Sequence, residues 1–354
     1  MIESARTRRS AAGAPVLAVV IPTRERVAQV TRLLAALEAQ QGLAPGSCEV
    51  VVVVDGSSDG TAGALASLTF KFPLTTLELR HSGPGTARNT GWTHTQAPLV
   101  LFLDDDLLPN PRLLAQHISA HREHPNAVVL GHISPDRTER PDAWTLYDQA
   151  TMEDRYAALG RKEVPSGIHV GGNFSVQRRH LDQVGGFDDH LLVSEHIDLG
   201  FRLAQVGLKF VYAPSAEAVH CGRRSYEKWC LRHRIQGRMD VALYRDRGYA
   251  GGLQSLVACY HDRKLLTRLA VRLALTRKGL ESAVVGSSGW MARTAHALGL
   301  EPVAKAALSA TANTIYWGGV RDGLRGNTAF WRLVRRTRSH NGRPYLRFPT
   351  RRLN

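Results

Sequence analysis

Continuous apolar runs alternate with helical patterns in the first part of the chain. The runs lie at 16–21, 49–54, 74–79 and 99–103, and each is bounded by a turn signal, which is typical of strands buried on both faces of a parallel sheet. Apolar residues at helical spacing occupy 24–40, and two further helical patterns follow Gly60 and Gly83. Strands that alternate with helices predict βαβ units. We therefore expect an α/β fold with a parallel sheet flanked by helices.

The pattern becomes less regular after the fourth run. Further helices and strands are predicted at 111–123, 127–133, 171–176, 195–203, 209–212 and 217–220. The segment 134–170 is rich in Pro, Asp and Arg and is predicted to be an irregular excursion over the site, whereas the chain from 225 onward has helical patterns. The predicted organisation is a flexible N-terminal arm (1–14), one domain (15–222) and a basic, mainly helical C-terminal region (223–354).

The basic charge is concentrated in the C-terminal third of the chain. Residues 1–220 hold 20 Lys and Arg against 24 Asp and Glu, a net −4, whereas residues 221–354 hold 26 against 7, a net +19. Such a field favours an anionic partner: lipid headgroups, a phosphorylated acceptor or nucleic acid. The segments 264–278 and 330–338 combine Lys and Arg with Leu, Phe and Trp, which is typical of amphipathic helices on anionic membranes. The alternative for the charge is a basic surface that serves only solubility. For the two segments it is ordinary surface helices that pack back onto the 15–222 domain.

Cysteine usage and hydropathy bear on the location of the protein. The four cysteines have no metal-site spacing, and no run of ~18 uncharged apolar residues occurs. The sequence therefore predicts a cytoplasmic protein with reduced thiols. The basic helices add the prediction of a peripheral position on the inner face of the cell membrane, and the oligomeric state is unknown.

Three adjacent carboxylates, Asp104 to Asp106, follow the 99–103 strand. Carboxylates in a row repel one another unless solvent or a cation offsets the repulsion. Ligands bind outside the carboxyl ends of strands in open α/β sheets, and carboxylates that face a diphosphate suit Mg²⁺ or Mn²⁺. The triplet is thus either a metal-diphosphate site or a solvated acidic turn before the next helix.

Motifs in a fixed order over residues 15–222 resemble those of glycosyltransferase family 2, which has the GT-A fold. The resemblance implies a Rossmann-like, mixed but mainly parallel sheet flanked by helices. Each motif is weak alone, but the order makes the resemblance specific. The segments are the strand ending at 22–24, then 53–61, 85–91, the DxD motif at 104–106, and the acceptor-side segments 171–174, 185–188 and 195–199. The resemblance implies an inverting, metal-dependent enzyme that moves a sugar from a nucleoside-diphosphate sugar, most often a UDP-sugar, to an acceptor hydroxyl. The Q-x-x-R-W motif and membrane helices of processive members are missing, which predicts transfer of a single sugar.

The resemblance assigns the metal to the acidic triplet. Asp106 would bind Mn²⁺ or Mg²⁺ directly, and Asp104 would meet the ribose or the metal. Asp105 is assigned to the nucleotide-sugar pocket, although the alternation of side chains at a strand end predicts that it points elsewhere. His220 follows an apolar segment and either completes the metal shell or has a structural role.

The remaining pocket residues come from the other motifs. Asp55 resembles the residue that accepts the N–H of the base, commonly uracil, and Arg88 suits contact with a diphosphate. The same resemblance gives the nucleotide-sugar pocket Pro22, Thr23 and Arg24. On the acceptor side it gives Gly172 and Asn173. For Arg24 and Arg88 the alternative is an exposed charge on a helix surface.

The sequence departs from the family at the residue expected to act as general base. The family motif reads approximately Glu-Asp-x-Asp, with the base at the second position, and this chain has His196 there, between Glu195 and Asp198. His196 could take the proton, since an imidazole pKa near ~6.5 fits base catalysis at neutral pH. Alternatively, Glu195 is the base and His196 lines the acceptor pocket. On a helix, Glu195 and Asp198 share a face that His196 does not.

Three other functions compete with this hypothesis. A GT-A protein that has lost catalysis is disfavoured because the nucleotide and metal residues are present. A nucleotidyltransferase would need a Gly-rich phosphate loop after the first strand, where this chain has Pro22 to Arg26. A nucleic-acid-binding protein would fit the high pI, but the basic residues follow no helix-turn-helix or zinc pattern, so no nucleic acid is expected.

Overall fold

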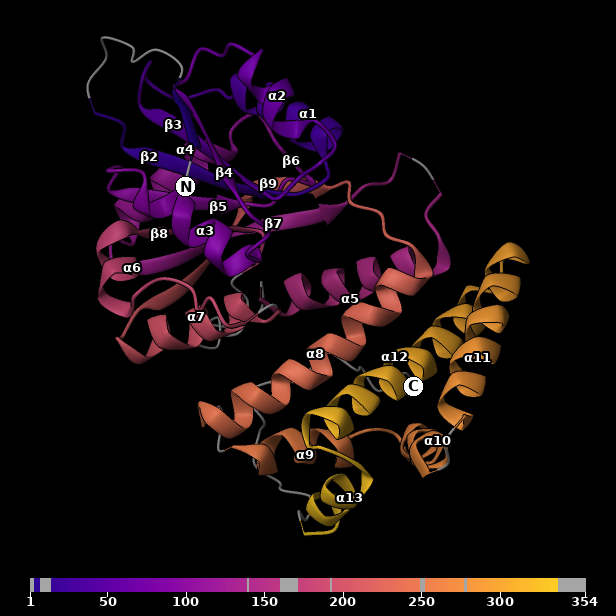
Figure 1. Cartoon of the computed structure of the whole chain (residues 1–354). Helices are drawn as coiled ribbons and strands as arrows, with labels where there is room; N and C mark the ends of the chain where they lie inside the picture. The colour runs from indigo at the N-terminus through magenta and orange to yellow at the C-terminus, as the bar shows by residue number, and fades with distance from the viewer. Residues whose placement is uncertain are drawn as a thin grey trace. The chain divides into compact units, whose positions relative to one another are not determined.

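The chain forms two compact units (Figure 1). Unit 1 comprises Met1–Asp136 and Tyr156–Gly222, and unit 2 comprises Arg137–Arg155 and Arg223–Asn354, so the chain passes between the units at three points. The computed structural model describes residues 3–6, 14–138, 140–159, 171–191, 193–248, 252–276 and 279–336.

Unit 1 contains a nine-stranded sheet with the order β1-β4-β3-β2-β5-β8-β7-β9-β6. Its strands are β1 (Glu3–Arg6), β2 (Leu17–Thr23), β3 (Cys48–Asp55), β4 (Leu74–Leu79), β5 (Leu99–Leu103), β6 (Leu107–Pro109), β7 (Ala127–Pro135), β8 (Asn173–Gln177) and β9 (Lys209–His220). The pairs β2–β3, β2–β5, β3–β4 and β7–β9 are parallel, and the other four neighbouring pairs are antiparallel. The predicted mixed sheet with flanking helices is therefore confirmed, with parallel and antiparallel pairs in equal number.

The carboxyl ends of β2, β3 and β5 meet at one edge of the sheet because these strands run parallel. Thr23 and Asp55 are the last residues of β2 and β3, and Asp104 follows β5 directly. Below this edge, the buried ring of Phe102 lies 4.9 Å from Phe174 and 5.0 Å from Phe187, centroid to centroid. Aromatic packing of this kind fixes the end of β5 against β8.

Six helices belong wholly to unit 1. They are α1 (Val27–Glu38), α2 (Thr61–Ala66), α3 (Pro84–Thr93), α4 (Leu113–Glu123), α6 (Arg178–Val184) and α7 (Glu195–Gln205). Helix α3 packs on β2 and β3, and α4 packs on β7 and β9. The lack of a side chain at Gly91 permits the close approach of α3, since a Cβ there would lie 2.3 Å from Cγ1 of Val20.

A chain of buried polar side chains links α4 to the sheet. His121 Nε2 lies 2.9 Å from the Ser175 hydroxyl, which lies 2.8 Å from Nδ1 of His117. His117 Nε2 lies 2.9 Å from the side-chain oxygen of Asn173, whose amide donates to the carbonyl oxygens of His132 and Ala216. Burial lowers the pKa of both His117 and His121 to about 4, so both imidazoles are neutral in the folded protein at neutral pH.

The two neutral imidazoles should make the protein less stable in mild acid. Their folded pKa lies below the unfolded value near 6.5, so the unfolded chain binds more protons and the free energy of unfolding should fall as the pH drops from about 6.5 to about 4. The full shift is worth on the order of 3 kcal/mol for each group. Urea unfolding at a series of pH values measures this slope. His121→Gln should make this slope shallower. His190→Gln, at an exposed position, is the matched control and should not change the slope.

The structure differs from the predicted elements in several places, among them β6 and α6, for which no strand or helix was predicted. Residues 3–6, within the predicted flexible arm, form β1 antiparallel to β4. The predicted irregular excursion contains α5 (Ala143–Leu159). The two short strands predicted at 209–212 and 217–220 form one strand, β9, whose register against β7 shifts between Gly131 and His132. A bulge in the middle of a strand interrupts the alternation of side chains, which explains why the pattern there indicates two strands.

Unit 2 is helical. Besides most of α5 it contains α8 (Tyr226–Asp246), α9 (Leu253–His261), α10 (Leu265–Thr276), α11 (Leu280–Ala297), α12 (Glu301–Gly323) and α13 (Asn327–Arg336). Helices α8 and α12 lie alongside one another (Figure 1). Glycines permit their close contact: a Cβ at Gly237 or Gly319 would lie 2.1 Å from a backbone oxygen of the facing helix. In the part of the chain that the structure describes, no helix has the length and apolar character needed to cross a membrane.

Candidate functional site

The acidic triplet lies where three segments of unit 1 meet. The backbone N–H of Asp104 donates to Gly172 O, and the N–H of Cys221 donates to Asp106 O, at 2.9 and 2.8 Å. Neither Gly172 nor Gly222 could carry a side chain without displacement, because a Cβ would lie 2.2 Å from Oδ2 of Asp104 or 2.4 Å from Oδ2 of Asp106. The backbone therefore comes within van der Waals contact of two carboxylates that the sequence predicts to be functional.

Arg26 neutralises two members of the triplet. Its Nη1 lies 2.7 Å from Asp105 Oδ1 and 2.8 Å from Asp106 Oδ2, and Thr23 donates to Asp105 Oδ2 at 2.7 Å. Burial nevertheless raises the pKa of Asp105 to about 6, and the neighbouring charge of Asp106 contributes in the same direction. Arg24 is the residue predicted for this pocket, and Arg26 was not predicted. Arg24 instead contacts His81 Nε2 at 2.9 Å.

The loop that carries Arg26 is held by the turn after β3. The backbone N–H of Glu25 donates to Ser57 Oγ, and the Glu25 carboxylate accepts hydrogen bonds from the backbone and hydroxyl of Ser58. Asp59 accepts from the backbone N–H of Val27, the first residue of α1. Glu25 has a positive φ of 52°, a conformation that side chains rarely adopt without such support. These contacts turn the backbone so that Arg26 faces the triplet.

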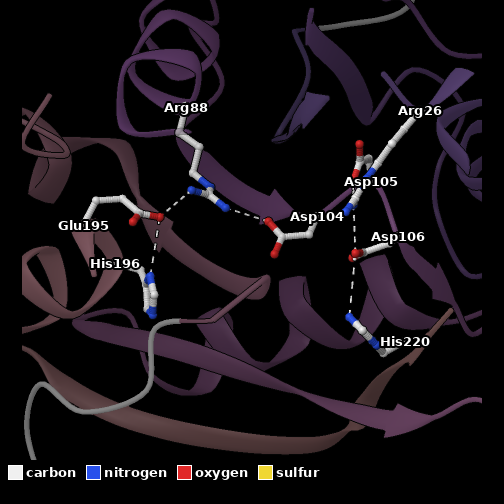
Figure 2. A network of polar contacts seen from close by, with 8 residues as sticks. All are labelled: Arg26, Arg88, Asp104, Asp105, Asp106, Glu195, His196 and His220. Atoms are coloured by element: carbon white, nitrogen blue, oxygen red, sulfur yellow. Dashed lines mark hydrogen bonds and ion pairs between the residues drawn. The ribbon is translucent and has the colours of Figure 1, made fainter. Parts of the chain in front are cut away.

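His220 lies on the other side of Asp106. It is the last residue of β9 and pairs in register with Leu107 of β6, next to the triplet. Its Nε2 lies 3.7 Å from Asp106 Oδ2 (Figure 2). Within the described ranges, three or more His, Cys, Asp or Glu side chains nowhere come together as a metal cage. Asp106 and His220 offer two protein donors, so any ion here would take its other ligands from substrate and water.

Arg88 connects the triplet to the helix α7. Its side chain, on α3, is buried. The distance from Arg88 Nη2 to Asp104 Oδ1 is 2.7 Å, and the distance from Nη1 to Glu195 Oε1 is 2.8 Å (Figure 2). The two guanidinium nitrogens thus join two carboxylates that are 91 positions apart in the sequence (195 − 104). The alternative of an exposed surface charge is excluded for Arg88, which is 8% exposed.

Glu195 and His196 start α7 and contact each other. His196 Nδ1 lies 3.4 Å from Glu195 Oε1, the same oxygen that Arg88 contacts. Burial by itself would raise the pKa of Glu195, but the charge and hydrogen bond of His196 and the charge of Arg88 outweigh it and lower this pKa to about 2. Glu195 is therefore a buried, ionised group at neutral pH. The His196 side chain is 32% exposed and can meet a ligand.

Other predicted site residues have partners within unit 1. Asp198 is buried and lies 2.6 Å from Arg202 Nη2, one turn further along α7, so its carboxylate is used inside the helix layer. Asn173 is 2% exposed, and its amide joins α4, β7 and β9 as described above. Both side chains thus make contacts within the fold, and the roles of Asp198 in catalysis and of Asn173 in acceptor binding stay predictions.

Asp55 is held by the start of α3. It is buried and accepts hydrogen bonds from the backbone N–H groups of Ser82 and Gly83, at 2.6 and 3.0 Å, and His81 Nδ1 lies 3.1 Å from it. Carboxylates that accept backbone N–H groups at the N-terminus of a helix stabilise that terminus. Pro22 lies within β2, one residue before Thr23.

Part of the chain matches a known protein family. Residues 18–185 match the model of glycosyl transferase family 2. The chain is 30% identical to validoxylamine A glucosyltransferase of Streptomyces hygroscopicus subsp. limoneus, over 55% of this chain and 49% of that protein. It is 28% identical to pre-mycofactocin glycosyltransferase of Mycobacterium tuberculosis, over 62% of this chain and 45% of that protein. The chain thus spans about half the length of these curated relatives.

Solved structures show the same fold at lower sequence identity. The mannosyltransferase PcManGT of Pyrobaculum calidifontis, in complex with GDP-Man and Mn²⁺, has a TM-score of 0.55 at 20% identity, over 86% of this chain and 88% of that one. Residues 1–349 of S. aureus TarS, in complex with UDP, have a TM-score of 0.52 at 16% identity, over 87% and 89%. Residues 18–185 of this chain thus match glycosyltransferase family 2, and the sheet unit that contains them has the GT-A fold.

Proposed function

We propose that this protein transfers a single sugar from a nucleoside-diphosphate sugar to a hydroxyl group of an acceptor, with inversion at the anomeric carbon. The observation that carries the proposal is the continuous set of contacts from Asp104 through Arg88 and Glu195 to His196. It joins the residues predicted to face the leaving diphosphate to the residues predicted to face the acceptor. The curated relatives named above, which are glycosyltransferases by name, support the same reaction class.

The donor set at the triplet fits Mn²⁺ or Mg²⁺. Carboxylate oxygen and imidazole nitrogen suit Mn²⁺, and Mg²⁺ is commonly bound through one or two carboxylates together with substrate phosphates. Asp106 and His220 would hold the ion, with Asp104 beside it. A bound ion would offset the charge that develops on the departing diphosphate.

We propose His196 as the general base. Glu195 is buried, ionised and contacted by Arg88, so it is poorly placed to accept a proton, but it can hold the Nδ1–H of His196. That contact leaves Nε2 to accept the proton of the acceptor hydroxyl as its oxygen attacks the anomeric carbon. The bond from that carbon to the diphosphate oxygen breaks, and its electron pair leaves with the diphosphate. A single displacement of this kind needs no covalent enzyme intermediate.

A panel of nucleoside diphosphates tests the donor. UDP, GDP, TDP and ADP are added with Mn²⁺, with Mg²⁺ or with EDTA, and the thermal midpoint of the full chain is measured. We expect UDP with Mn²⁺ to raise the midpoint most and Asp106→Asn to abolish the metal-dependent part of the increase. Ligands that bind only the folded state stabilise it by mass action. A panel in which no nucleotide raises the midpoint would contradict the proposed function.

Arg26 should contribute to diphosphate binding more than Arg24. Arg26 is 36% exposed at the side chain and already faces the triplet, and a guanidinium suits a phosphate. We expect Arg26→Gln to weaken the affinity for the nucleoside diphosphate by about tenfold, because a charge-assisted hydrogen bond is worth roughly 1.5–3 kcal/mol. Arg24→Gln, two residues away, is the matched control with a much smaller expected effect. Isothermal titration of both variants measures the difference, and equal losses would contradict this assignment.

A further inference from the structure

Helix α10 of unit 2 carries apolar side chains on two of its faces. Val271, Ala274 and Leu275 are buried, and α10 packs on α11 and α12. Four leucines of the same helix are exposed: Leu265, Leu266, Leu269 and Leu273 are 61, 80, 52 and 60% exposed. Among the residues that the structure describes, packing within unit 2 accounts for the inner face of α10 and leaves the outer face exposed.

The exposed leucines form a row. Leu266, Leu269 and Leu273 are spaced by three and four residues, so they lie on the same face of the helix. Leu265 lies next to this row, one turn before Leu269. A row of large apolar side chains in water is unfavourable, and contiguous exposed apolar surface typically marks a site of protein or membrane interaction.

Cations border this outer face. Lys264, directly before α10, and Arg268 and Arg272 within it are spaced by four residues, and Lys264 and Arg272 are exposed. The sequence from 263 to 280 contains no Asp or Glu, and residues 221–354 carry a net +19. A second copy of the same basic face would be repelled, whereas an anionic surface would be attracted.

We propose that the outer face of α10 binds a membrane surface that contains anionic lipids, with the leucine row in the interface and the cations on the headgroups. An amphipathic helix with an apolar row and neighbouring Lys and Arg binds in the plane of such an interface. The other segment predicted to meet the membrane, 330–338, does not share this feature. Phe330 and Val334 are buried in unit 2, and residues 337 and 338 lie outside the described residues. Binding of α10 to a membrane surface does not depend on sugar transfer.

Co-sedimentation of the full chain with vesicles tests the proposal. One set of vesicles is made of phosphatidylcholine and the other of phosphatidylcholine with phosphatidylglycerol. We expect binding to the second set, and a loss of at least about tenfold in the partition coefficient for the double change Leu266→Gln and Leu269→Gln. The matched control is Leu298→Gln with Leu300→Gln, which changes two leucines that are 69 and 50% exposed outside α10. This control should bind as the unchanged protein does.

The charged border is tested separately. Lys264→Gln with Arg272→Gln should reduce binding to anionic vesicles on the order of tenfold, because each cation near such a surface contributes about 1 kcal/mol. Binding of the unchanged protein should also fall as salt is raised. Equal binding to both sets of vesicles, or equal loss in the α10 and control variants, would overturn the proposal. A third outcome would also overturn it: the leucine variant changes its oligomeric state on gel filtration but still binds vesicles. That result would identify a second copy of the chain as the partner.

Discussion

Replacing His196 with alanine is expected to lower kcat by about 10²- to 10⁴-fold, the range that a positioned general base contributes. At the start of α7, the His196 side chain is partly exposed and contacts a buried carboxylate. Its loss therefore removes the proposed acceptor of the proton and little packing. Turnover is measured as release of nucleoside diphosphate from the sugar donor that the binding panel identifies. Affinity for the nucleoside diphosphate should stay unchanged, because the triplet, Arg26 and Arg88 are intact.

Glu195→Gln is the companion to this experiment. A glutamine oxygen can still accept the Nδ1–H of His196, so this variant should lose less turnover than His196→Ala. Both variants should bind the nucleotide normally. If Glu195→Gln were the more damaging change while His196→Ala kept most of its turnover, Glu195 would be the base and the role proposed for His196 would be wrong.

Replacing Arg88 with methionine is expected to reduce both stability and turnover. The change keeps similar bulk but leaves Glu195, whose side chain is 6% exposed, without its cation, and it releases Asp104. Removing one partner of a buried ion pair costs roughly 3–5 kcal/mol, and we expect the lower end because the Asp104 side chain is 36% exposed. Urea unfolding at neutral pH measures the change in the free energy of unfolding.

Two further variants identify the cause of that loss. Arg88→Met combined with Glu195→Gln should recover part of the stability, since the carboxylate left unpaired is then neutral. Arg122→Met, at an exposed position of α4, is the control and should change stability by less than about 0.5 kcal/mol. If Arg88→Met and Arg122→Met had the same free energy of unfolding, the ion pairs of Arg88 would not stabilise the fold.

Local patterns were sufficient to predict the central strands of the sheet. The apolar runs at 49–54 and 99–103 became β3 and β5 because strands buried on both faces need apolar residues at every position. Helix α5 has no such signature. Apolar and polar residues follow no clear helical period along it. Its apolar side chains pack on helices that follow much later in the chain. Long-range contacts of this kind override local preference and cannot be read from a single segment.

The site was predictable in its residue types and less so in its contacts. Asp104, Asp106, Arg88 and Glu195 were all named from motifs, and the structure brings them together. Arg26 was missed because its direction depends on the positive φ of Glu25, which follows from contacts with a separate turn. The alternation rule failed for Asp105 because the backbone leaves the strand at Asp104, so Asp105 and Asp106 can contact the same nitrogen of Arg26.

The chain order of the two units limits how the enzyme can be shortened. In the sequence, α5 lies between β7 and β8 of unit 1, but most of it belongs to unit 2. There Ala143 is buried, with Trp144 and Tyr147 beside it, against Trp229 and other residues of unit 2. A chain cut after Gly222 would keep α5 and lose every helix that covers it, leaving two large aromatic side chains exposed to water. During synthesis on the ribosome, these residues also emerge well before Trp229. The nascent chain therefore passes through a stage in which α5 has no partner, and this stage is the one most open to aggregation.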